Sequence, residues 1–149
     1  MFKKILVPVD IDYPDTAALV YRKARAIAEL SQADIHIVTV IPGFSMPMVA
    51  AMVPEEVRQE AIARIKAALE QFVADHCDKT VTHALRTGKN WEEIIGAADE
   101  WQADLIVVYH NRHHEINDMF SRSCSQRVAD HANCSVLWLR NVQPQPEGL

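Results

Sequence analysis

Near its start the chain reads Lys4-Ile5-Leu6-Val7-Pro8-Val9-Asp10, a short apolar run that is rich in β-branched residues. A run of this kind, bounded by polar residues, indicates a buried strand. Four comparable apolar runs follow it along the chain, and the further strands are expected at residues 34–41, 81–86, 105–109 and 135–139.

Stretches with apolar side chains at helical spacing separate these strands. Helices are expected at residues 16–30, from about 54 to 72, from 90 to 101, and through 119–132, whereas residues 42–53 are expected to be irregular. Asp15 or Thr16 is the expected N-cap of the first helix, and Asn90 with Glu93 has capping-box spacing. Because strands and helices alternate, the sequence predicts an α/β fold with an open, doubly wound parallel sheet.

Length and composition fit one globular domain. The chain has 149 residues, of which 49% are hydrophobic and 23% are charged, as in ordinary water-soluble proteins. We expect a single domain over residues 1–140 and a flexible tail over residues 141–149, which contains two prolines and little to bury. No apolar run reaches the roughly 18 residues of a membrane helix, so no membrane partner is expected.

Charge and cysteine usage narrow the class of partner. The net charge of −5 argues against binding nucleic acid through its phosphate backbone, although it leaves a small anionic ligand possible. Cys77, Cys124 and Cys134 follow no motif spacing, which favours reduced thiols and a cytoplasmic location. A disulfide between two of them is the alternative.

The turn after the fourth expected strand has no glycine, since none lies between Gly96 and Gly148. In an open parallel sheet, ligands bind outside the carboxyl ends of the strands. A loop that wraps closely around phosphates needs glycines there, because its backbone must approach the ligand and adopt positive φ. The sequence therefore argues against a backbone cradle for phosphates in this turn.

Several segments together resemble the universal stress protein family over roughly residues 2–140. The similar segments are residues 4–10, Ala-Asp-Ile-His-Ile-Val-Thr-Val at 33–40, Gly88, Ala-Asp-Leu-Ile-Val-Val at 103–108, and the last helix and strand at 127–140. The resemblance implies a Rossmann-like fold of the adenine nucleotide alpha hydrolase type. Its five strands would lie in the order 3-2-1-4-5, with helices on both faces.

Nucleotide-binding members of that family carry a glycine, two residues, a second glycine, nine residues, and a third glycine before serine or threonine. The matching positions here are Tyr109, Arg112, Arg122 and Ser123, so that only the serine is retained. The side chains of Tyr109, near the ribose, and Arg122, near the γ-phosphate, would crowd the cradle. The loop is more similar to the branch of dimeric stress proteins that lack the glycines and bind no nucleotide.

Two functions follow from this comparison. The first is a non-enzymatic, dimeric regulator without tight ATP binding, which acts through protein partners that the sequence does not name. The second is a nucleotide sensor or weak ATPase, in which Asp10, the backbone of Val40, Arg122, Ser123 and Ser125 hold ATP or AMP weakly. Arginine and serine at a helix start can hold an anion without glycines. Asp10 has a structural alternative, because a strand-end carboxylate also accepts N–H groups of its own turn.

His110, His113 and His114 form a cluster that could hold zinc or nickel. Adjacent histidines rarely point the same way, so a solvated loop is the preferred interpretation, and no metal site is assigned. The chain also lacks a nucleophile elbow, a spaced carboxylate pair and a Walker lysine, which favours a protein that is not an enzyme.

The last expected strand suggests how two copies could associate. If the apolar run from Ser135 to Leu139 lies at a sheet edge, it exposes backbone donors and acceptors. A second copy related by a two-fold axis would cover them, so the sequence predicts a homodimer through this strand.

Overall fold

The computed structural model of the chain describes residues 1–41, 47–110 and 121–140. Its strands are β1 (Lys4–Pro8), β2 (Asp34–Ile41), β3 (Thr82–Thr87), β4 (Leu105–His110) and β5 (Ser135–Arg140). They form one parallel sheet of five strands in the order β3-β2-β1-β4-β5, so the expected α/β fold and strand order are confirmed.

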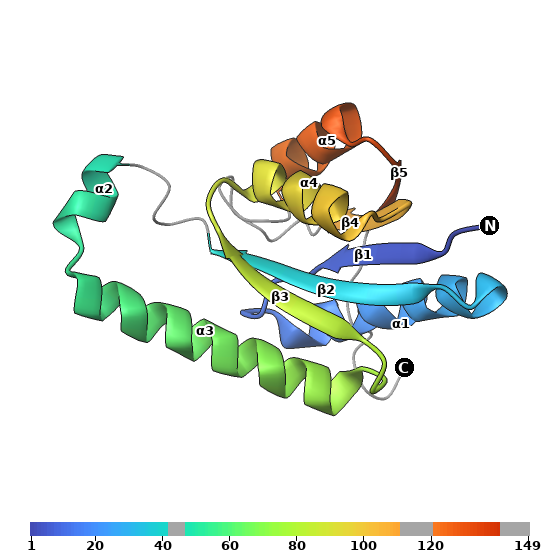
Figure 1. The fold of residues 1–149 in the computed structure, drawn as a ribbon, viewed down its shortest axis with the longest axis horizontal. Helices are drawn as coiled ribbons and strands as arrows, with labels where there is room; N and C mark the ends of the chain where they lie inside the picture. The colour runs from blue at the N-terminus through green and yellow to red at the C-terminus, as the bar shows by residue number, and fades with distance from the viewer. Residues whose placement is uncertain (42–46, 111–120, 141–149) are drawn as a thin grey trace.

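Helices cover both faces of this sheet. They are α1 (Pro14–Ser31), α2 (Pro47–Met52), α3 (Glu55–His76), α4 (Asn90–Trp101) and α5 (Arg122–His131). Figure 1 shows α4 and α5 on one face, with α1 and α3 on the other, while α2 and the first part of α3 extend beyond the sheet. The central strands β1 and β4 are almost entirely buried between the two helical layers, as their continuous apolar runs require.

The structure corrects three expectations about helix boundaries. Tyr13 and Lys89 are the N-caps of α1 and α4, and neither makes a side-chain cap, so the caps expected at Asp15 or Thr16 and at Asn90 were wrong. Pro14 starts α1 two residues before the expected start at Thr16, because proline lacks the N–H and has helical φ. Within the stretch expected to be irregular, α2 forms because Pro47 opens a run of methionine and alanine, which favour helix.

The pairing of the strands opens the sheet at one place. β1 pairs with β2 along its whole length, from Lys4 to Pro8, but with β4 only at Ile5 and Leu6. β1 and β4 therefore diverge toward their carboxyl ends. The strand order reverses between β1 and β4, because β2 and β3 lie on one side of β1, whereas β4 and β5 lie on the other. Open α/β sheets bind ligands at such a topological switch point.

None of the helices in the described ranges is both long and apolar enough to cross a membrane.

All three cysteines are free thiols, so the alternative of a disulfide is not realised. Burial raises the pKa of Cys77 to about 11 and that of Cys124 to about 12, which keeps both thiols protonated at neutral pH.

On the α4 side of the sheet, His36 of β2 is held between neighbouring elements. Its Nδ1 lies 2.6 Å from Thr82 Oγ1, and its ring stacks on Trp101 with the centroids 5.2 Å apart. Burial lowers the pKa of His36, and the positive charges of His83 and Lys4 lower it further. As the pH falls, His36 in the unfolded chain therefore begins to bind a proton while His36 in the folded protein is still neutral.

This environment predicts a pH dependence of stability. Because the pKa of His36 is lower in the folded state, its contribution is complete above about pH 6.5 and is lost as the pH falls through the folded value. We expect the free energy of unfolding to fall less in His36→Gln than in the unmodified protein when the pH drops from about 7.5 to about 5.5. Urea unfolding at both pH values measures this difference, and equal losses would contradict it.

Candidate functional site

The candidate site lies at the carboxyl ends of β1, β2 and β4, where β1 and β4 diverge. Asp10 lies two residues beyond the end of β1 at Pro8, and the N–H of the intervening Val9 donates to the Val38 carbonyl at 2.8 Å. Because alternate residues of a strand direct their backbone groups to the same side, the N–H and C=O of Val40 point past the end of β1. The structure thus places Asp10 and the backbone of Val40 at the same end of adjacent strands.

The Asp10 carboxylate is used within its own turn. Its Oδ1 accepts the N–H of Asp12 at 3.0 Å, and its carbonyl oxygen accepts the N–H of Tyr13 at 3.1 Å. An aspartate that bonds two residues ahead in this way forms an Asx turn, which stabilises the entry into α1. This geometry corresponds to the structural alternative for Asp10.

Tyr109 occupies the end of β4 and is fully buried. Burial raises the pKa of its phenol, the negative charge of Asp10 adds to the rise, and a backbone hydrogen bond with Asp10 opposes it. The phenol therefore lies against Asp10, at the point where β1 ends and β4 continues. A glycine at this position, as in the nucleotide-binding members that the sequence resembles, would leave that volume open.

The start of α5 brings together the serines of the predicted anion site. Ser121 is the N-cap, and its Oγ accepts the N–H of Cys124 at 3.2 Å and lies 3.2 Å from Ser123 Oγ. Ser125 is buried, and its hydroxyl donates to the Tyr109 carbonyl at 3.4 Å. The hydroxyls of Ser121 and Ser125 are therefore engaged inside the protein, whereas Ser123 and Arg122, the first residue of α5, are exposed.

The backbone at this helix start has an ordinary conformation. In the described ranges, positive φ occurs only at Gln32, Gly88 and Gln102, none of which belongs to residues 121–125. A phosphate-binding nest requires consecutive N–H groups that converge through a left-handed residue. Residues 121–125 contain no such residue, so the amides there offer an anion only the open end of a helix.

The structure describes only some of the other basic and histidine residues of the predicted sites. Arg127 lies over the Trp91 ring of α4, with its Cζ 5.6 Å from the centroid, and so contacts α4. His110 ends β4, while Arg112, His113 and His114 lie outside the described residues. Within the described part of the chain, no three His, Cys, Asp or Glu side chains are grouped closely enough to hold a metal ion.

Sequence reasoning missed a charged cluster beside the carboxyl end of β3. Arg86 donates from Nε to Glu93 at 2.8 Å and from Nη1 to Glu100 at 2.7 Å, which ties β3 to α4. Glu93 and Glu100 are seven positions apart and so share one face of a helix. That spacing was visible in the sequence, but the residue that faces it depends on how α4 lies on the sheet.

Comparison with known proteins identifies a family for this chain. The sequence pattern of the Universal stress protein family matches residues 1–140. The chain belongs to this family.

Solved structures agree with the assignment. The chain is similar to the universal stress protein UspA from Lactobacillus plantarum, with 28% identity over 93% of this chain and 97% of that one, and a TM-score of 0.68. Its fold also matches that of the hypothetical protein MJ0577, with 21% identity, coverage of 97% and 99%, and a TM-score of 0.74. A third neighbour is the universal stress protein from Archaeoglobus fulgidus in complex with dAMP, with 21% identity, coverage of 91% and 96%, and a TM-score of 0.56.

Proposed function

We propose that this universal stress protein is a non-enzymatic binding module that acts through protein partners and does not hold ATP tightly. One observation carries the proposal: the polar side chains at the crevice are bonded to the protein itself. The Asp10 carboxylate bonds Asp12, the Ser121 hydroxyl caps α5, and the Ser125 hydroxyl donates to β4. A nucleotide would have to share these groups with the bonds they already make, and each protein–ligand bond formed in this way would give little net free energy.

The proposal includes a homodimer through β5. In the described part of the chain, β5 lies at one edge of the sheet and pairs with β4 alone. Four apolar residues of this strand, Val136 to Leu139, are only partly buried in one copy. Pairing of β5 with β5 of a second copy about a two-fold axis would cover both the apolar groups and the free backbone groups.

A second candidate is a nucleotide sensor with a weak, diverged site. The Archaeoglobus fulgidus neighbour in complex with dAMP supports it, as do the Val40 backbone and the amides of Arg122 and Ser123 at the start of α5. In this alternative the adenosine would lie beside Asp10 and the phosphate at α5. A weak ATPase would require the same contacts.

Isothermal titration with ATP, ADP and AMP distinguishes the two candidates. We expect no dissociation constant in the micromolar range, which corresponds to about −8 kcal/mol, because residues 121–125 at the start of α5 form no backbone cradle. Micromolar binding that changes in Arg122→Gly would instead establish the sensor. Sedimentation equilibrium of the same sample tests the dimer, and a monomer at every concentration would contradict it.

A further inference from the structure

We propose that the outer edge of β3 is a docking site for an extended, lysine- or arginine-bearing segment of a partner protein. The segment would pair with β3 as an added strand. This inference rests on the proposed function and names the surface and the chemistry of one partner. The proposed surface lies at the edge of the sheet opposite to β5.

Among the described strands, β3 pairs with β2 alone, because it lies at the edge of the sheet. The Gly88 N–H donates to the Ile41 carbonyl of β2 at 3.2 Å. Since the backbone alternates with a period of two, the N–H and C=O groups of His83, Leu85 and Thr87 point away from β2. Figure 1 shows this edge between α4 and α3, with none of the described elements lying across it.

The edge also lacks the features that usually prevent strand addition. Natural edges are protected by proline, by outward lysine, by bulges or by a covering helix. β3 reads Thr-His-Ala-Leu-Arg-Thr, without proline or lysine. Its one arginine, Arg86, is held by Glu93 and Glu100 of α4 and is only 23% exposed, so it does not guard the edge.

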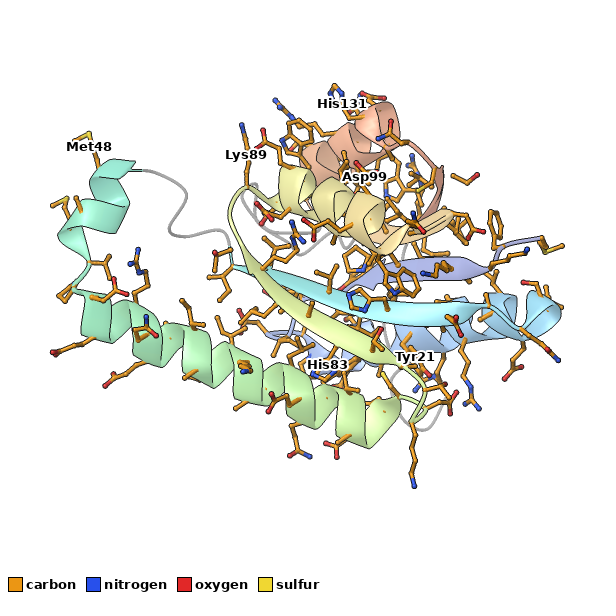
Figure 2. All side chains as sticks on the ribbon, in the orientation of Figure 1. Tyr21, Met48, His83, Lys89, Asp99 and His131 are labelled. Atoms are coloured by element: carbon orange, nitrogen blue, oxygen red, sulfur yellow. The ribbon has the colours of Figure 1, made fainter. Side chains whose placement is uncertain are left out.

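Three recesses lie along the same strand. A recess of about 450 Å³ borders its amino end at Asp78, Thr80 and Val81, and one of about 230 Å³ lies on the α4 side at Ala84 and Arg86. A third, of about 530 Å³, lies at Thr87 and Gly88 beyond the carboxyl end. In Figure 2, Tyr21 is near the amino end of β3, His83 lies on the strand, and Lys89 follows its carboxyl end. Bound strands gain affinity from backbone pairing and specificity from such side-chain recesses.

The charges of the recesses select the partner. The amino-end recess has three carboxylates, Glu29, Asp34 and Asp78, against the single guanidinium of Arg25. The carboxyl-end recess has the carboxylates of Glu55, Glu92 and Glu93, which pair with Arg58, Lys89 and Arg86. In the middle recess Arg86 also pairs with Glu100, so that one guanidinium faces two carboxylates. A cationic strand therefore complements this edge, most strongly at its amino end, whereas an acidic strand is repelled.

Amide hydrogen exchange, resolved by residue in NMR spectra, tests the pairing directly. The probe is the peptide acetyl-Lys-Thr-Lys-Val-Lys-Thr-Lys-amide, and its control replaces every lysine with glutamate. We expect the lysine peptide to slow exchange at His83, Leu85 and Thr87 by about tenfold, and to leave Ala84 and Arg86, which already bond β2, unchanged. No slowing, or equal slowing by the glutamate peptide, would overturn the proposal. Slowing that rises with protein concentration without peptide would show self-pairing instead, and would also overturn it.

A matched pair of variants separates the contribution of the His83 backbone N–H to peptide binding from that of the His83 side chain. His83→Pro removes an outward N–H and leaves the bonds to β2, a position that edge strands tolerate, whereas His83→Ala keeps the N–H. We expect the lysine peptide to bind about tenfold more weakly to His83→Pro than to His83→Ala. Equal binding to two folded variants would contradict the proposal. If circular dichroism shows His83→Pro to be unfolded, Thr87→Pro and Thr87→Ala provide the same comparison.

The outcome is independent of the nucleotide titration. Tight ATP binding together with unchanged peptide binding would overturn the proposed function alone. Loss of peptide pairing without nucleotide binding would overturn the β3 surface alone.

Discussion

Replacement of Tyr109 by alanine is expected to lower the free energy of unfolding by about 3–5 kcal/mol. The Tyr109 ring is fully buried at the end of β4 and belongs to the hydrophobic core of the sheet. Its removal loses the transfer free energy of an aromatic ring and leaves a cavity between rigid strands, which can close only partly. Urea unfolding followed by circular dichroism measures the change, and the slope of free energy against urea should stay nearly constant.

The matched control is Tyr109→Phe, which keeps the ring and removes only the hydroxyl beside Asp10. We expect it to cost about 1 kcal/mol or less, the usual net value of one hydrogen bond. If alanine and phenylalanine had similar effects, the ring would contribute little packing energy. The position of Tyr109 in the core would then be wrong.

Replacement of Gly88 by alanine is expected to lower the free energy of unfolding by about 2–3 kcal/mol. Gly88 has φ +146°, which residues with a side chain rarely adopt. An added Cβ would also lie 2.6 Å from Glu93 Oε1, and Glu93 is held in place by Arg86. Both the dihedral strain and this contact oppose the substitution, and thermal and urea unfolding should agree on its size.

Gly96→Ala is the control for the general effect of adding a methyl group. Gly96 lies inside α4, where alanine is favoured over glycine by about 1 kcal/mol. Its Cβ would be 3.0 Å from Arg86 Nη2, the end of a long side chain that can shift. We expect a net change near zero. If Gly88→Ala were as mild as Gly96→Ala, the strained turn between β3 and α4 would be disproved.

The fold was predictable because the strongest patterns in the sequence come from the buried centre. β1 and β4 are continuous apolar runs, and a strand needs such a run only when helices cover both of its faces. The helix starts were less predictable, because they depend on tertiary contacts. Glu93 could have closed a capping box with Asn90, but in the structure it bonds Arg86 of β3.

The candidate site could be predicted only as far as strand order determines it. Asp10 and Val40 end neighbouring strands, so a parallel sheet must bring them to one edge. The rotation of α5 about its axis is not specified by the local sequence. That rotation turns Ser125 toward the Tyr109 carbonyl and Arg127 onto Trp91, away from the anion site expected for the serines and arginines.

The strand order has one more consequence for how partners could be engaged. β3 and β5 lie at opposite edges of the sheet. A dimer joined at β5 would form one continuous sheet with a β3 edge at each far end, about 40 Å apart at the usual strand spacing. Such a dimer would be bivalent. A partner that carries the cationic segment twice, on a linker long enough to span that distance, would then bind through avidity, without any new contact at either edge.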